Sequence, residues 1–335
     1  MAMAKRNYSK NVKNMEAAVQ TLFFTGLTVP ASTFNPDGTP ILLSEAEYYI
    51  DLSQCASLAN RRFYRQGLNW AVAGFKLVSA ADVRALSSIS KIPNTWVASN
   101  AWEKAFRAWN KQQMDTVDEA GAQSALARFR DFKVYADVDH VAAGFGANLL
   151  PFAHSPGEWQ ASQIVVPNIV TDAGGSQTDP REYTLHMVGI NNNAAGLSRG
   201  IIEGYADSRA YPQSPDPVSP SLGSSANWLR DMFDVGNDNV EIIQNATDRN
   251  DNLPYPQVDY PGGETQAAAL QQHDREFISA TTIGGTTRLK GGNFPCGLIK
   301  IAIVNLSTEE ISPQLYLDLV PGHHRGYLAE AMTEM

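Results

Sequence analysis

The sequence predicts an all-β protein, an antiparallel sandwich, and three observations lead to this fold class. About eight to ten segments with strand character are scattered over the 335 residues. These segments do not alternate with helices in a βαβ rhythm, which argues against a doubly wound parallel sheet. Hydrophobic residues make up 43% of the chain, enough to build a substantial core.

The N-terminal third carries the densest strand signals. Residues 19–29 are rich in β-branched and aromatic side chains, and the Asn-Pro-Asp-Gly turn at 35–38 follows them. In residues 50–58, every second side chain falls on one face, and all of these but Gln54 are apolar; residues 60–66 continue the alternation. Gly67 interrupts this run before the extended segment 68–78. We therefore expect a nearly continuous β region from 48 to 80.

Further strands are expected along the rest of the chain. The two strongest, 298–306 and 314–320, lie near the C-terminus. Weaker strand signals cover residues 132–136, 160–170, 183–190 and 276–283. Residues 199–211 fit a strand or a helix equally well.

One amphipathic helix stands out among the strands. Trp102, Ala105, Phe106 and Trp109 recur at the spacing of a single helical face. Asn100 is the expected N-cap, with Glu103 closing a capping box. A second short helix is expected at about 119–130. Together they predict a helical insertion at about 99–130.

Two long polar segments predict surface loops, at about 213–225 and 237–261. Within the second, Asp248, Asn250 and Asn252 match the start of a calcium-binding loop. The glycine that should follow is replaced by leucine, so this is a weak calcium candidate, and a simple Asx-turn loop is the alternative.

The expected organisation is a short basic arm, 1–14, followed by one domain, 15–335. Eight strands in two four-stranded sheets would make that domain a jelly roll. A double jelly roll is the alternative, because 335 residues could accommodate it. No internal repeat is visible, which favours the single sandwich.

Charge and composition restrict the function. Charged residues are 18% of the chain, below the roughly 25% of an average soluble protein. A low charge content suits a surface buried against neighbouring subunits, although an ordinary neutral-surfaced enzyme would have it too. The net charge of −9 excludes a protein that coats nucleic acid with its whole surface. Cys55 and Cys296 are expected to be small buried residues.

Two groups of basic residues are candidates for local contact with nucleic acid. Lys5, Arg6, Lys10 and Lys13 lie in the arm without an intervening acid, so the arm is either a phosphate-binding tail or a frayed terminus. Arg61, Arg62 and Arg65 surround Phe63 and Tyr64; arginines bind phosphates, and aromatic rings stack on unpaired bases. Cross-strand pairing with carboxylates is the alternative role for these arginines.

The chain offers little sign of catalysis. It contains no phosphate-binding loop, nucleophile elbow or zinc-protease motif. Asp137, Asp139 and His140 would not converge on a metal from a strand, and the adjacent His323 and His324 would diverge as well. We expect no enzyme activity, no cofactor and no metal. No apolar run is long enough for a membrane span, and the N-terminus lacks the apolar stretch of a signal peptide.

Three tracts carry a family resemblance: 93–113 (PNTWVASNAWEKAFRAWNKQQ), 130–150 (RDFKVYADVDHVAAGFGANLL) and 319–327 (LVPGHHRGY). They resemble capsid proteins of small circular single-stranded DNA viruses known mainly from environmental, often marine, sequences. The likeness covers most of the chain from about residue 51 onward. It implies a jelly-roll subunit that self-assembles into an icosahedral shell. Many such capsids begin with a long arginine-rich arm, whereas this chain has four basic residues there.

The function expected from this resemblance is that of a structural virion protein, a major capsid subunit. Its expected partners are further copies of itself, the viral genome bound without sequence preference, and minor capsid proteins. It would assemble in the host cell and reside in the virion. The alternatives are a β-sandwich carbohydrate-active or cupin-like enzyme and a carbohydrate-binding or receptor-binding protein.

Overall fold

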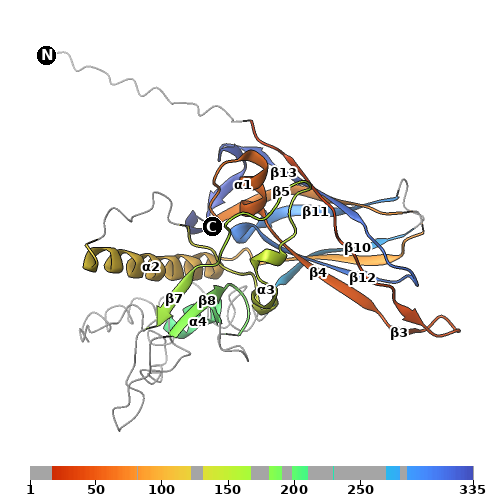
Figure 1. Cartoon of the computed structure of the whole chain (residues 1–335), viewed down its shortest axis with the longest axis horizontal. Helices are drawn as coiled ribbons and strands as arrows, with labels where there is room; N and C mark the ends of the chain where they lie inside the picture. The colour runs from red at the N-terminus through yellow and green to blue at the C-terminus, as the bar shows by residue number, and fades with distance from the viewer. Residues whose placement is uncertain are drawn as a thin grey trace, which may run out of the picture.

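The computed structural model describes residues 17–80, 82–121, 131–166, 181–190, 198–209, 229, 269–279 and 285–334. These residues fold mostly into β-strands in antiparallel sheets, with a few helices (Figure 1). The predicted antiparallel β character is confirmed, and 26% of the structure is helical. The arm 1–14, the loops 213–225 and 237–261 and most of the predicted second helix lie outside the described residues.

Two antiparallel sheets form the body of the molecule. The first has the order β1-β13-β5-β11, and the second has the order β10-β6-β12-β4. The strands of the first sheet are β1 (Thr21–Phe24), β13 (Gln314–Leu319), β5 (Leu68–Val78) and β11 (Thr286–Phe294), and the short β16 (Ala329–Ala331) also pairs with β5. The strands of the second sheet are β10 (Gln271–Ile278), β6 (Ala85–Lys91), β12 (Leu298–Asn305) and β4 (Ser44–Asp51).

Alternating burial explains why these segments are strands. Along β12, Ile299, Ile301 and Ile303 are buried while the residues between them are partly exposed. Phe75 and Leu77 of β5, in the other sheet, join the same hydrophobic core. The two sheets therefore enclose one core, as the sheets of a sandwich do.

The pairing of the eight main strands follows a regular rule. In chain order, the first strand pairs with the eighth (β1·β13), the second with the seventh (β4·β12), the third with the sixth (β5·β11) and the fourth with the fifth (β6·β10). Two further pairs, β13·β5 and β12·β6, join these ribbons side by side into the sheets.

Antiparallel strands place successive connections at opposite ends of the sandwich. One end carries α1 (Leu52–Asn60), the turn η6 (Pro295–Gly297) and the long insertion 92–270 between β6 and β10. The other end carries the β2–β3 hairpin (Thr33–Phe34 and Pro40–Leu42), which lies far from α2 in Figure 1. There the Ser79 amide donates to the Gly285 carbonyl at 2.9 Å, tying two connections together.

The insertion builds a second core next to the sandwich. It contains α2 (Trp96–Glu119), α3 (Val138–Ala143), η2 (Phe145–Ala147), β7 (Gln163–Val166), β8 (Arg181–His186), β9 (Ser198–Gly200) and α4 (Ile201–Arg209). The predicted stripe on α2 is confirmed, with Trp102, Ala105 and Trp109 buried and Phe106 packed against them. The predicted N-cap is wrong: Thr95 caps the helix, and Asn100 lies within its second turn.

Local structure corrects three other predictions. Residues 52–60 form helix α1 instead of a strand, and residues 61–67 are irregular. The predicted strand 132–136 makes one isolated bridge, between Tyr135 and His186. The sequence did not predict β6 or β11. The remaining elements are β14 (Pro321–Gly322), β15 (Gly326–Tyr327) and η7 (Met332–Glu334).

Substitutions on β12 test the shared core. Ile301 is buried between the sheets, whereas Val304 lies on the opposite face and is half-buried. We expect Ile301→Ala to lower the free energy of unfolding by about 2–5 kcal/mol because it leaves a cavity, and Val304→Ala to lower it clearly less. Urea unfolding measures both values, and equal losses would contradict the assignment of the two faces.

Candidate nucleic-acid pocket

A pocket of about 470 Å³ opens between residues 63–68, helix α2 and the C-terminal segment 324–333. Its lining is aromatic and basic. The aromatic side chains are Phe63, Trp102, Phe106 and Phe132, and the basic ones are Arg65, Arg107, His324 and Arg325. These segments and the one that contributes Phe132 come from different parts of the sequence, and the fold brings them together.

A buried carboxylate holds the first wall in place. Asp51, at the end of β4, caps α1 by accepting hydrogen bonds from the amides of Ser53 (2.9 Å) and Gln54 (3.3 Å). Its Oδ2 accepts from Gln66 Nε2 at 3.1 Å and from Trp159 Nε1 at 2.9 Å. The carboxylate therefore joins the sandwich, the segment before β5 and the insertion.

Gln66 extends this connection to the next segment. Its Nε2 also donates to the Val134 carbonyl at 2.9 Å, and its Oε1 accepts from the Val134 amide at 2.6 Å. Both hydrogen-bonding groups of the Gln66 amide are thus engaged inside the protein. Residues 63–66 are fixed against the insertion as a result, which sets the position of Phe63 and Arg65.

Close packing defines the floor of the pocket. The Trp102 ring lies so close to Gly67 that a Cβ there would come within 2.3 Å of it, so no larger residue fits without displacing the ring. Trp102 stacks on Phe106 with ring centroids 5.3 Å apart and planes 6° from parallel. Phe132 meets Trp102 edge-on at 5.9 Å. Trp102 and Phe132 are buried, and Phe106 is half-buried.

The C-terminal wall is tied to the first one. The Tyr64 hydroxyl donates to the Arg325 carbonyl at 3.0 Å, and Arg325 Nη1 donates to the Phe63 carbonyl at 2.6 Å. Arg325 adopts a left-handed backbone conformation with φ of 51°, at the tip between β14 and β15. This arrangement holds its exposed guanidinium beside the pocket.

The pocket has an excess of positive charge. Among the described residues, three arginines line it, against one carboxylate, Glu103, which is paired with Arg107 one helical turn away. Asp131 is close enough to Arg65 to interact with it electrostatically, but it also forms an ion pair with Lys133. Burial raises the pKa of the Asp131 carboxyl despite these cations. In a chain of net charge −9, this positive site is a local feature.

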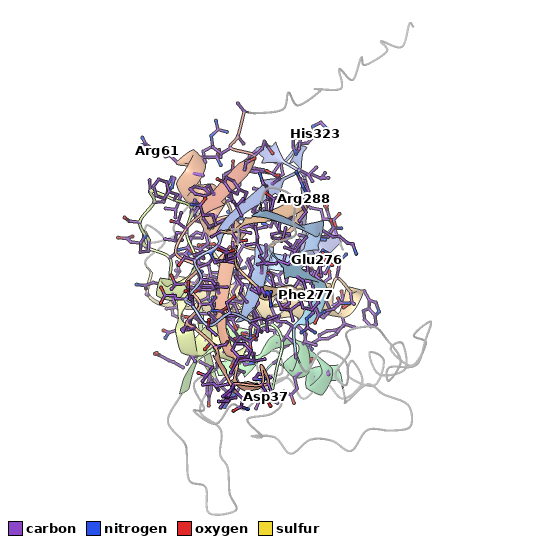
Figure 2. All side chains as sticks on the ribbon, turned by 90° about the vertical axis from the view of Figure 1, so that its right-hand side faces the viewer. Asp37, Arg61, Glu276, Phe277, Arg288 and His323 are labelled. Atoms are coloured by element: carbon purple, nitrogen blue, oxygen red, sulfur yellow. The ribbon has the colours of Figure 1, made fainter. Side chains whose placement is uncertain are left out.

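The structure separates the three arginines predicted from the sequence. Arg65 lines the pocket, whereas Arg61 and Arg62 are exposed outside its lining. Figure 2 shows Arg61 at the upper end of the molecule, with Asp37, in the turn of the β2–β3 hairpin, at the lower end. Arg107 and the aromatic floor were not predicted as site residues. Lys5, Arg6, Lys10 and Lys13 lie outside the described residues, as do Asp248, Asn250 and Asn252.

Asp137, Asp139 and His140, which were not expected to bind a metal, have a structural role. Asp137 caps the short helix α3 instead of ending a strand, with Oδ1 accepting from the His140 amide at 2.8 Å. Lys300 Nζ lies among three carboxylates, 2.9 Å from Glu47, 3.6 Å from Asp137 and 3.3 Å from Asp139. These carboxylates share a lysine ammonium.

His140 is held as a neutral ring. Its Nδ1 accepts from the Ala136 amide at 3.1 Å, which leaves Nε2 to donate to Asn148 Oδ1 at 2.8 Å. Burial lowers the pKa of His140 to about 4. In the described part of the chain, no group of histidine, cysteine and acidic side chains is arranged to hold a metal ion. Cys55 and Cys296 are buried free thiols, as predicted.

Comparison of the chain with protein-family models, curated proteins and solved structures finds no match. Among the described residues, no helix has the length and apolar character needed to span a bilayer.

The buried carboxyl of Asp51 makes stability depend on pH. Burial raises its pKa from 3.8 to about 6, so the folded state binds the proton more tightly than the unfolded chain does. The contribution of Asp51 to stability therefore falls as pH rises from about 4 to about 6, by roughly 3 kcal/mol for about two pKa units. It then stays constant above about pH 6.

Subtracting the unfolding free energy of Asp51→Asn from that of the wild type isolates this effect, because the other titrating groups cancel. We expect the difference to decrease across this window and then level off. Urea unfolding at a series of pH values, followed by tryptophan fluorescence, provides the measurement. A difference independent of pH would show that the Asp51 pKa is not raised.

Proposed function

We propose that this chain is a self-assembling shell subunit, a major capsid protein of a small tailless virus, and that its sandwich is a jelly roll. The pairing order of the eight main strands is the observation that carries the proposal. A jelly roll can be described as a long antiparallel ribbon that rolls up into two sheets. In that ribbon the first strand pairs with the eighth, and so on inward until the fourth strand pairs with the fifth. The orders β1-β13-β5-β11 and β10-β6-β12-β4 match that description.

The same order favours a single jelly roll over a double one. A double jelly roll would divide its strands between two separate sandwiches. Here the N-terminal strands β1 and β4 pair with the C-terminal strands β13 and β12, closing one sandwich across the whole chain. The insertion 92–270 interrupts the sequence of this sandwich without supplying any of its eight strands.

Fold alone does not give function, because jelly rolls also occur in lectins and cupins. A cupin or a glycosidase needs converging histidines or a pair of free carboxylates. The carboxylates gathered at Glu47, Asp137 and Asp139 are instead organised around Lys300, and His140 is engaged on both ring nitrogens. Because these carboxylates and this histidine already have partners within the protein, we favour a shell subunit over an enzyme.

The surface offers contacts for association. Ile41, Leu42 and Leu43 are consecutive, and each is at least 41% exposed. They lie in and just after β3 of the hairpin that extends from the sandwich in Figure 1. Exposed apolar groups of this kind commonly mark protein contacts. In a closed shell, many modest contacts between identical subunits add up to a stable particle.

Assembly is the direct test. We expect purified protein to form capsomers or particles tens of nanometres across, seen by gel filtration and negative-stain microscopy. Ile41→Asp combined with Leu42→Asp should abolish or strongly reduce assembly while leaving the urea midpoint unchanged, since both side chains are exposed.

Thr308→Asp combined with Gln314→Asp is the matched control, because it adds the same two charges at exposed positions just after β12 and at the start of β13, at the same end of the sandwich but outside the hairpin. We expect it to assemble much better than the first variant. Equal losses in both would exclude apolar contact through Ile41 and Leu42. Wild-type protein that stays monomeric at every concentration would refute the shell proposal.

The basic arm has a separate role in this proposal, that of holding the genome. Lys5, Arg6, Lys10 and Lys13 give it a local positive charge suited to phosphate. We expect deletion of residues 1–14 to leave assembly intact and to reduce packaged nucleic acid, measured as the ratio of absorbance at 260 and 280 nm in purified particles. Unchanged nucleic-acid content would show that the arm does not package.

A further inference from the structure

The accessible rings of the pocket form a stacking surface. Phe63 and Phe106 are half-buried and line the cavity. Phe106 packs on Trp102 and Phe132, and Phe63 packs on Trp159 with ring centroids 6.3 Å apart. An aromatic ring that keeps one accessible face can stack on a nucleobase, whatever the base. Bases in a duplex are already stacked and paired, so they could not reach into such a cavity. The rings therefore suit an unpaired base.

The arginines complement a phosphate. Arg65, Arg107 and Arg325 come from three different segments and meet at one pocket. Guanidinium groups bind phosphate oxygens in pairs, which gives both attraction and orientation. Glu103, the one carboxylate among the described lining residues, is paired with Arg107, so it does not offset the other two arginines. Aromatic rings alone would also suit a sugar, but this excess of arginine favours an anionic ligand.

The walls are fixed before any ligand arrives. Tyr64 holds the Arg325 backbone, Arg325 holds the Phe63 carbonyl, and Gly67 is in contact with Trp102. A site that is already ordered loses little conformational entropy on binding. The volume of about 470 Å³ lies within the range of roughly 300–1,000 Å³ typical of small-molecule sites. It suits one nucleotide.

From these observations we infer that the pocket binds one unpaired nucleotide of a single-stranded nucleic acid, with the base on Phe63 and Phe106 and the phosphate on Arg65 and Arg325. This inference rests on the proposed function, in which the chain encloses a genome. It adds a defined second contact beyond the arm, and it requires that the enclosed nucleic acid expose unpaired bases at the shell.

Binding of a fluorescein-labelled thymidine oligomer to the full chain, followed by fluorescence anisotropy at several salt concentrations, tests the inference. We expect the single strand to bind at least about tenfold more tightly than a duplex of the same length, because only the single strand offers a base for stacking. Equal affinity for the two would overturn the inference, since phosphate attraction alone would then account for binding.

Two arginines of the same segment provide a matched pair. Arg65→Gln removes a pocket charge, and Arg61→Gln removes an identical charge outside the lining. We expect Arg65→Gln to weaken single-strand binding severalfold and to reduce the slope of log K against log salt by about 0.7, the value for one phosphate contact on a single strand. Arg61→Gln should change neither quantity. Equal effects would mean a diffuse electrostatic surface instead of a pocket.

Stacking is tested separately with Phe106→Leu, which keeps an apolar side chain but removes the ring. We expect at least about a fivefold loss of single-strand affinity with an unchanged salt slope. An unchanged affinity would exclude stacking on Phe106. Displacement of the oligomer by a neutral chito-oligosaccharide at lower concentration than by thymidine monophosphate would instead identify a sugar site and refute the inference.

The two proposals fail in different ways. Particles that assemble normally but show no single-strand preference would refute the pocket and leave the shell proposal standing. A monomer that never assembles but binds the single strand through Arg65 would refute the shell and leave the binding site. Light scattering on each variant, run beside the anisotropy measurement, separates these results.

Discussion

The structure depends on one buried carboxylate, that of Asp51, at the junction of its two hydrophobic cores. Removing an ionised carboxylate from water is expensive unless hydrogen bonds replace the solvent. Here the amides of Ser53 and Gln54 and the side chains of Gln66 and Trp159 supply four of them. The donors come from α1, from the segment before β5 and from the insertion. One side chain at the end of β4 thus fixes where the insertion sits on the sandwich, and with it the walls of the pocket.

Strands with one buried face were predictable from the sequence, and those without a clear alternation were not. The alternation along β12 and β13 placed both within one residue of their observed ends, and the predicted range of β5 was correct. Residues 52–60 also alternate, yet their first five residues are all buried, so no single face had to be selected. The feature that indicates a helix here is Asp51 as N-cap with Gln54 three residues later. The alternating pattern of the same residues suggested a strand instead. In β6, serines separate the apolar residues and Ser87 is itself buried, which hid the strand.

The pocket could not have been found from spacing, because its walls come from parts of the chain about 40 to 260 residues apart. Arg65 was identified only because Arg61 and Arg62 lie beside it and make the segment locally basic. Arg107 lies in a helix whose apolar stripe predicted packing and gave no sign of a binding site. The stacking of Trp102 on Phe106 is visible only in the structure. The clustering of basic residues in the sequence therefore identified one of the three pocket arginines, Arg65, together with two arginines that lie outside the pocket.

The two ends of the sandwich differ in chemistry, and the topology explains why they can. At the insertion end, three connections join the strands: α1, η6 and residues 92–270. Because residues 92–270 lie between β6 and β10, they can build a second core without altering the register of the eight strands. The insertion end presents aromatic rings and arginines, while the opposite end presents the apolar hairpin of β2 and β3. In the proposed shell, contact with other subunits and contact with nucleic acid would then use separate surfaces. That separation would also let an acidic chain bind phosphate locally, because the positive charge would need to be dense only where the proposed single strand is held.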